Sequence, residues 1–356
     1  MDPEQAVAYK TVNLFFLLIA IFVFLSIGSR RKQKENIIPT FSNFFVVSLL
    51  LITILLITFF PVGNATDKFR YERMFNEPFL LITMSDLGWA AYTYLIKIIF
   101  NNSTIYFLIT AFVYVIGYYI FSVKMIPKKY LFVFLLACFG TFGFLSYGVN
   151  TLRAGFGLSL LLIAIANSKK KSVFLILAVL SVLFHKSTFI PIVAYIVTYY
   201  LKDTKIYLTV WFFALIIAIT DISLISDFLQ KYLGNFDNRV TTYLDPQEEV
   251  EYNTGFRLGF VLYSLVPIII GYYYIKKMMI KDSTYIRFFN MYIMTNSVWL
   301  LIMRIIYSDR IAYLSWFLIP IIFLLPLFRQ RVFVNQRLYI SFILLGLIFF
   351  NFIMML

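Results

Sequence analysis

The segment that decides the fold of this chain is residues 148–186, GVNTLRAGFGLSLLLIAIANSKKKSVFLILAVLSVLFHK. It holds two apolar runs joined by a turn that contains a run of lysines. With a rise of about 1.5 Å per helical residue, Arg153 lies roughly 24 Å from Lys169 along the first run, and His185 lies roughly 20 Å from Ser172 along the second. We therefore expect a helical hairpin across a membrane, with its lysines at one face and with Arg153 and His185 at the other.

Arg153 and His185 are the residues of this hairpin with the clearest chemical potential. An arginine just inside a membrane helix is expensive to bury and by default marks a functional site. His185 is the single histidine of the chain, and it titrates near neutral pH, so it fits a general base or proton shuttle. The structural alternatives are that Arg153 snorkels to lipid headgroups and that His185 bonds to a carbonyl at a helix end.

The composition is typical of a polytopic membrane protein. Hydrophobic residues make up 62% of the chain and charged residues 13%, whereas soluble domains are about half apolar and a quarter charged. The net charge of +14 is first an orientation signal, because Lys and Arg stay on the cytoplasmic side, so we expect no nucleic-acid partner. The only cysteine, Cys138, lies in an apolar run and fits a buried core residue.

Apolar segments long enough, or nearly so, to span a membrane recur along the whole chain. We expect an all-α polytopic bundle of about 12 transmembrane helices, in a single integral-membrane domain that covers residues 1–356. The expected spans are approximately 11–28, 41–61, 104–123, 130–147, 152–168, 173–185, 187–201, 206–222, 258–275, 286–303, 311–327 and 338–355. The sixth and seventh are short and meet at His185, so we expect their shared end below the membrane surface.

The connections between these segments alternate in charge. One set is short and carries most of the 31 Lys and Arg residues and few of the 17 acidic residues. The positive-inside rule makes this face cytoplasmic and places both termini outside. The longer connections, about 62–103 and 223–257, are then outer loops, and residues 86–100 of the first have the helical spacing of an interfacial helix.

The polar residues near the apolar core gather on the expected outer side, and cations dominate among them. They are Asp67, Arg70, Asn150, Arg153, His185, Arg257, Arg304, Asp309 and Arg310. Several guanidinium groups together suit a pyrophosphate, which they bind in a two-point fashion and stabilise as a leaving group. Asp67 fits either a base or a partner that holds Arg70, and Asp309 with Arg310 fits a structural ion pair.

The motifs of metal and nucleotide sites are missing from the sequence. With one histidine and one cysteine, it contains neither the His-Glu-x-x-His nor the paired-cysteine spacing of zinc sites. It has no Asp-x-Asp pair at Asp67 and neither a Walker lysine loop nor a dinucleotide glycine pattern. We therefore expect no metal and no cofactor, and a lipid-borne donor fits better than a nucleotide-borne one.

Three short motifs, taken in order, resemble the EpsG-like family of Wzy-type bacterial polysaccharide polymerases. They are Asp67-x-x-Arg70-Tyr71 after the second span, Asn150-x-x-Arg153 at the start of a span, and His185-Lys-Ser after the next span. In the family the motif that corresponds to Asn150-x-x-Arg153 usually reads Asn-x-x-Arg-Gln, whereas Ala154 follows Arg153 here. The resemblance covers about 40–325, and it is carried by the order of the motifs and the topology rather than by any one motif.

The resemblance implies a metal-independent, GT-C-like glycosyltransferase of O-antigen, capsule or exopolysaccharide synthesis, located in the bacterial cytoplasmic (inner) membrane. Such an enzyme moves a growing glycan from undecaprenyl pyrophosphate to the sugar of an incoming lipid-linked repeat unit at the outer face. Its partners would be these two lipid-linked substrates, membrane lipids and a chain-length regulator protein. Taking the residue pattern and the resemblance together, we expect His185, Arg153 and Asp67 to be catalytic and Arg70, Tyr71, Asn150, Arg257, Arg304 and Arg310 to bind the pyrophosphate or the glycan.

Other functions remain open at this stage. A transporter such as a lipid-linked oligosaccharide flippase needs polar residues near the midplane, and the expected mid-helix segments are bare. A membrane O-acyltransferase would favour a histidine on the cytoplasmic face, opposite to the expected side of His185. An O-antigen ligase shares the donor and the chemistry, and only the family resemblance favours a polymerase over it.

Overall fold

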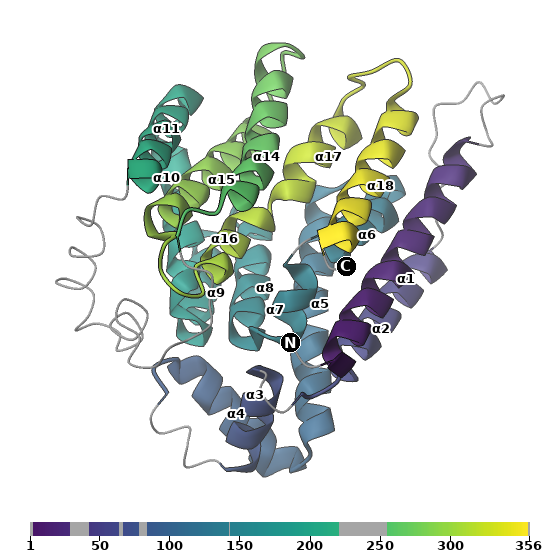
Figure 1. Cartoon of the computed structure of the whole chain (residues 1–356), viewed down its shortest axis with the longest axis vertical. Coiled ribbons are helices and arrows are strands. Elements are labelled where there is room, and N and C mark those ends of the chain that lie inside the picture. The colour runs from purple at the N-terminus through teal and green to yellow at the C-terminus, as the bar shows by residue number, and fades with distance from the viewer. Residues whose placement is uncertain are drawn as a thin grey trace. The chain divides into compact units, whose positions relative to one another are not determined.

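The computed structural model describes residues 3–28, 43–63, 67–77, 84–141, 143–220 and 255–354. These residues form helices and turns without a strand among them (Figure 1). The chain divides into two compact units: Met1–Phe189 with Phe323–Leu356 form unit 1, and Ile190–Ile322 form unit 2. Of the outer loop expected at about 223–257, only the last three residues, 255–257, are among the described residues.

The helices of each unit follow in chain order. Unit 1 contains α1 (Pro3–Gly28), α2 (Asn43–Thr58), α3 (Asp67–Asn76), α4 (Leu87–Phe100), α5 (Ser103–Met125), η2 (Lys128–Tyr130), α6 (Leu131–Phe139), α7 (Phe144–Val149), α8 (Leu152–Ala166), α9 (Lys171–Phe184), η3 (Lys186–Thr188), the second part of α17 (Ile319–Arg329) and α18 (Gln336–Met354). Unit 2 contains α10 (Phe189–Tyr200), α11 (Thr204–Thr220), α14 (Leu258–Lys276), α15 (Ser283–Ile302), α16 (Asp309–Trp316) and the start of α17.

The expectation of an all-helical chain that contains helices long and apolar enough to span a membrane is confirmed for the described residues. Five helical segments are long and apolar enough to cross a membrane, namely α1, α5, α14, the α16–α17 pair and α18. Shorter apolar helices, α2, α4, α8, α9 and α11, accompany them. Every predicted span coincides with one helix or with a pair of helices, while the total of about 12 crossings stays a prediction.

Two of the predicted spans are interrupted. Segment 130–147 forms α6 and α7, because the chain turns between them at Gly143, whose φ of 106° lies in the left-handed region that glycine adopts without strain. Segment 311–327 forms α16 and α17 with a short step between them. Pro320 sits in the first turn of α17, where a proline is tolerated but cannot continue a preceding helix.

Small residues pack the hairpin formed by α8 and α9 closely, both against α5 and between its own two helices. A Cβ on Gly117 of α5 would come within 2.4 Å of the Cβ of Ser159 on α8, so only glycine allows this approach. On the other side of α8, the Ser181 hydroxyl of α9 donates a 2.7 Å hydrogen bond to the carbonyl oxygen of Gly157. Small residues and interhelical hydrogen bonds of this kind hold membrane helices together without a hydrophobic driving force.

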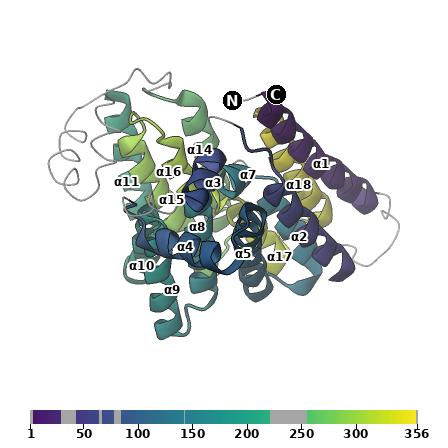
Figure 2. The same ribbon diagram turned by 90° about the horizontal axis from the view of Figure 1, so that it is seen from below.

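The two ends of unit 1 differ in character. At one end, α3 and α4 lie where α8 begins and α9 ends, as Figure 2 shows from below, and the first turn of α4 approaches the last turn of α9 so closely that a Cβ on Gly88 would lie 3.0 Å from the backbone of Leu183. At the other end lie the basic turns. The Lys124 ammonium bonds to the Asn167 side chain, and Arg329 Nη2 donates to the Met125 carbonyl at 3.1 Å.

Helix α3 is fixed to α2 by a buried lysine. Lys68 is 1% exposed, and its Nζ donates to the carbonyl oxygens of Ile57, Thr58 and Phe60 at 3.2, 2.8 and 2.6 Å. These carbonyls belong to the last turn of α2 and the residues after it, where helix carbonyls lack partners. Burial lowers the pKa of Lys68 to about 8, while Glu72 opposes this shift.

Candidate functional site

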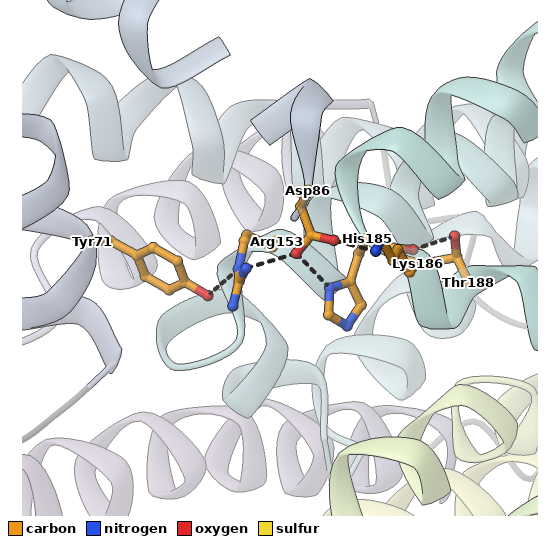
Figure 3. A network of polar contacts seen from close by, with 6 residues as sticks. All are labelled: Tyr71, Asp86, Arg153, His185, Lys186 and Thr188. Carbon is orange, nitrogen blue, oxygen red and sulfur yellow. Dashed lines mark hydrogen bonds and ion pairs between the residues drawn. The ribbon is translucent and has the colours of Figure 1, made fainter. Parts of the chain in front are cut away.

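Four side chains from separate parts of unit 1 meet at the end of the α8–α9 hairpin. They are Tyr71 of α3, Asp86 before α4, Arg153 of α8 and His185 after α9, and we call them the Asp86 cluster. Figure 3 shows the carboxylate of Asp86 between the guanidinium of Arg153 and the imidazole of His185. The structure thus brings together the two residues that the sequence placed at one face of the hairpin, and joins them through an acid from a third segment.

Arg153 stands in the first turn of α8, and its position follows from how that helix begins. Asn150 ends α7 and Thr151 begins α8. The Thr151 carbonyl accepts a 3.0 Å hydrogen bond from the backbone amide of Gly155. The Asn150 amide is held by the Tyr9 hydroxyl of α1 at 2.7 Å. The guanidinium therefore projects from a fixed helix start, with its side chain 19% exposed.

Asp86 occupies the residue before α4, where an aspartate usually caps its own helix. Its side chain makes no capping bond. Instead Oδ2 accepts a 2.6 Å hydrogen bond from Arg153 Nη1 and lies 3.6 Å from His185 Nδ1, and Oδ1 accepts from the Lys186 backbone amide at 3.4 Å. The Asp86 side chain is 0% exposed. A buried carboxylate is tolerated only with such partners, so burial ties Asp86 to the hairpin.

The position of His185 is set by the break between α9 and α10. Its backbone is extended, with φ −158° and ψ 112°, and it ends α9. Its carbonyl accepts both the Thr188 hydroxyl at 2.8 Å and the Thr188 amide at 3.0 Å. Because Nδ1 faces Asp86, Nε2 lies on the opposite edge of the ring, as Figure 3 shows. A carboxylate beside one ring nitrogen favours the tautomer that leaves the other nitrogen able to accept a proton.

An aromatic layer supports the Asp86 cluster from behind. The Tyr71 hydroxyl accepts a 3.2 Å hydrogen bond from Arg153 Nε, and the Tyr71 ring meets Trp89 edge-on at 5.3 Å between centroids. Phe156 of α8 stacks on Phe184 of α9 at 4.3 Å, and Trp89 meets Phe156 at 6.1 Å. The two loop helices are therefore fastened to the hairpin by rings, and these rings keep Asp86 away from bulk water.

Of the other unit 1 candidates, Tyr71 belongs to the Asp86 cluster, whereas Asp67, Arg70 and Asn150 are not among its four members. Asp67 is the first residue of α3 and is partly buried, and Arg70 on the same helix is exposed. Tyr71 lies in the cluster as a partner of Arg153. Asn150 bonds to Tyr9, so the structure gives it a role in fixing the start of α8.

The candidates of unit 2 make contacts of a different kind. Arg304 donates through Nε and Nη2 to the carbonyl of Ala218, at 3.3 and 3.0 Å, and so covers an end carbonyl of α11. Arg257 lies over the ring of Phe260 at 5.4 Å, and Arg310 lies over the ring of Tyr307 at 4.7 Å. Asp309 accepts from the Tyr313 hydroxyl at 3.3 Å.

Asp86 is the principal site residue that sequence reasoning missed. The segment Ser85-Asp86-Leu87 before an apolar helix has the pattern of an ordinary helix N-cap. Two observations could have pointed to Asp86 as the partner of Arg153: it precedes a helix with few other polar groups, and a buried Arg153 needs a counter-charge. Its pairing depends on a contact between positions 67 residues apart, which no local pattern reveals.

Comparison with known families identifies the chain. The model of the EpsG family matches residues 42–356, so the chain belongs to the EpsG family, as its motifs indicated. Membership supports a polysaccharide-polymerase-like, glycosyltransferase-like role in a membrane. Neither the curated proteins nor the solved structures contain a match.

Proposed function

We propose that this EpsG family protein polymerises lipid-linked oligosaccharide repeat units. It would transfer the growing glycan from undecaprenyl pyrophosphate to a hydroxyl of the incoming lipid-linked repeat. The observation that carries the proposal is the Asp86 cluster, which joins an arginine and an oriented histidine at one end of a membrane hairpin. These are the two groups that glycosyl transfer from a pyrophosphate needs, a cation at the leaving group and a base at the acceptor.

His185 serves as the general base in this proposal. Its Nδ1 is directed at Asp86, so Nε2 takes the proton of the acceptor hydroxyl as the new bond forms between that oxygen and the anomeric carbon. The bond from the anomeric carbon to the pyrophosphate oxygen breaks, and the pyrophosphate leaves with its lipid. The separation of 3.6 Å between Nδ1 and Oδ2 is longer than a hydrogen bond, and such catalytic contacts often tighten only when substrate binds.

Arg153 stabilises the leaving pyrophosphate. Its bonds to Tyr71 and Asp86 use Nε and Nη1 and hold the guanidinium in a fixed orientation at the end of the hairpin. With a neutral His185, the Arg153–Asp86 pair carries no net charge. When His185 accepts the proton, the cluster gains one positive charge at the moment that negative charge develops on the pyrophosphate, and stabilisation that arises only in the transition state raises the rate.

The same geometry favours the outer face for the reaction. Within unit 1 the Asp86 cluster lies at the end opposite to the basic turns that contain Lys124 and Arg329. If those turns are cytoplasmic, as the positive-inside rule requires, the cluster faces outward, where we propose that Asp67, Arg70 and Tyr71 contribute to binding the substrates. A GT-C-like architecture is part of the same proposal.

The reaction can be tested with purified protein and one defined lipid-linked repeat unit. We expect a ladder of products from the unaltered chain and from Lys170→Ala, which lies on the basic turn of the same hairpin, and none from His185→Ala at equal protein level. Product formed only after addition of a lipid A core acceptor would replace the polymerase with a ligase. Movement of the lipid across vesicles without a new glycosidic bond would replace it with a transporter.

Metal independence is a separate part of the proposal. The Asp86 cluster offers the Arg153 guanidinium for the pyrophosphate, and among the described residues no group of three or more His, Cys, Asp or Glu side chains comes together. We expect ladder formation to continue at an unchanged rate in excess EDTA. A rate that falls with EDTA and returns with magnesium or manganese would contradict the assignment of this role to Arg153.

A further inference from the structure

A second cationic feature lies at the opposite end of unit 1 from the Asp86 cluster. A cavity of about 200 Å³ lies where η2 meets the turn between α17 and α18. Figure 1 shows this turn at the end of α17. Its charged lining residues are Lys129, Arg329, Arg331 and Arg337, and none of the described residues that line it is acidic. A water molecule takes up about 30 Å³, so the cavity has room for a phosphate group with part of its hydration.

The cavity is built by specific contacts rather than by loose side chains. The Gln336 amide bonds to the Leu327 and Gln330 carbonyls, the second at 2.7 Å, and its oxygen accepts the Phe333 amide at 3.2 Å. This single side chain therefore fixes the turn that carries Arg331. On the other wall, Tyr130 stacks on Phe328 at 4.5 Å between ring centroids.

The positive-inside rule alone does not account for this arrangement. It requires basic residues on the cytoplasmic side, and exposed ones such as Lys169, Lys170 and Lys171 on the α8–α9 turn satisfy it. The rule does not require that cations from η2, from the end of α17 and from the start of α18 line the same cavity. Guanidinium groups around a cavity match the geometry of phosphate oxygens.

We propose that this cavity binds the phosphate of an anionic phospholipid in the adjacent leaflet. The apolar part of the lining consists of the buried residues Leu327, Phe328 and Ile340. Beside it, Leu338, Tyr339 and Phe342 of α18 are 38%, 46% and 52% exposed and offer a lipid-facing surface for acyl chains. A soluble phosphate would use only the cations, so the apolar surface next to them favours a lipid. The proposal does not depend on the glycosyl-transfer reaction.

The test compares two triple variants of the full chain that lose the same charge on the same side. Lys129→Gln, Arg331→Gln and Arg337→Gln are combined in one, and Lys169→Gln, Lys170→Gln and Lys171→Gln in the other. Arg329 is left in place because it also bonds to Met125. Retention of phosphatidylglycerol and of phosphatidylcholine by the detergent-purified protein is measured by native mass spectrometry.

We expect the cavity variant to retain phosphatidylglycerol on the order of 10²-fold less well, because each of its three cations contributes roughly a fivefold factor where it meets the headgroup. The three lysines of the control variant do not meet this headgroup, so its retention should change less than about twofold. Equal losses in the two triples would overturn the proposal. Displacement of the lipid by inorganic phosphate at matched concentration would overturn the choice of a lipid. Arg331→Gln alone, at an exposed position, should cost about fivefold, and an unchanged retention would equally count against the site.

Discussion

A buried polar cluster of unit 2 can be compared with the Asp86 cluster of unit 1, and the two differ in charge and exposure. In unit 2, Asn296 accepts from Trp211 Nε1 at 2.8 Å and donates to the hydroxyls of Ser264 and Ser315 at 3.0 Å each. Trp316 Nε1 donates to the same Ser264 oxygen at 2.8 Å. We call these five residues the Asn296 cluster. All of its members are neutral, and Asn296 is 0% exposed.

The Asp86 cluster contrasts with it on every count. It contains an ion pair and the only histidine, its contacts range from 2.6 to 3.6 Å, and the side chains of Arg153 and His185 are each 19% exposed. A network that is neutral and fully bonded gains nothing from a ligand, because its groups are already satisfied. A partly exposed network with a long contact can still change partners. We therefore propose that the Asn296 cluster stabilises the fold and that the Asp86 cluster takes part in the reaction.

The largest effect is expected for Asp86→Asn, which keeps the shape of the side chain but removes its charge. His185 would lose the carboxylate that orients it, and the loss of turnover should be on the order of 10²–10⁴-fold, the range for general-base machinery. The measurement is the rate of ladder formation per folded protein.

The decisive control for this prediction is the double variant Asp86→Asn with His185→Ala. If Asp86 acts through His185, the double variant should be no slower than His185→Ala alone, because residues that act as a unit are not additive. Multiplicative losses would separate Asp86 from His185 and contradict the assigned role.

The second largest effect is expected for Arg153→Lys. Lysine keeps the charge but loses the planar fork that bonds to both Tyr71 and Asp86. Removing one preorganised electrostatic contact typically lowers the rate on the order of 10²–10³-fold. The turnover assay used for Asp86→Asn measures it. Normal turnover of both Arg153→Lys and His185→Ala at normal protein level would move the site to Asp67, Arg70 and their surroundings.

The sequence predicted those parts of the site that depend on regular helix geometry. The rise of a helix places Arg153 and His185 at the same end of a hairpin, and the structure has them on a common carboxylate. Helix positions follow from long apolar runs. The pairing of Asp86 does not, because it depends on how the loop that contains α3 and α4 folds back on the hairpin. Arg304 looked equivalent to Arg153 in the sequence. Its bond to the Ala218 carbonyl forms only when α11 packs against α15, so the sequence could not reveal this difference.

A smaller effect, on stability rather than on turnover, is expected for Asn296→Ala. It leaves Trp211 Nε1 buried without its acceptor, and an orphaned buried donor costs about 1–3 kcal/mol. Unfolding in detergent, followed by tryptophan fluorescence, measures this loss, and turnover per folded protein should stay within about twofold of the unaltered chain.

The matched control for Asn296→Ala is Asn290→Ala on the same helix. Asn290 is also buried, but its single described bond, to the Lys202 carbonyl, is 3.4 Å long, so its removal should destabilise less. A large loss of turnover with unchanged stability for Asn296→Ala would mean that the unit 2 cluster also takes part in the reaction.

The smallest effect is expected for Arg304→Gln, and it separates the two interpretations of the outer arginines. As a residue that binds substrate, Arg304 would contribute like Arg153, and its loss would lower turnover on the order of 10²-fold. As the partner of the Ala218 carbonyl, it can be replaced by glutamine, whose amide still donates a hydrogen bond. Only the attraction between a cation and the carbonyl end of α11 is then lost, about 0.3–1 kcal/mol of stability. Because Nε and Nη2 of Arg304 both donate to the Ala218 carbonyl, we expect the second outcome, with turnover within about threefold of the unaltered chain. Parallel assays of Arg304→Gln and Arg153→Gln decide the point: equal losses would extend the anion site into unit 2, whereas a loss confined to Arg153 would restrict it to the Asp86 cluster.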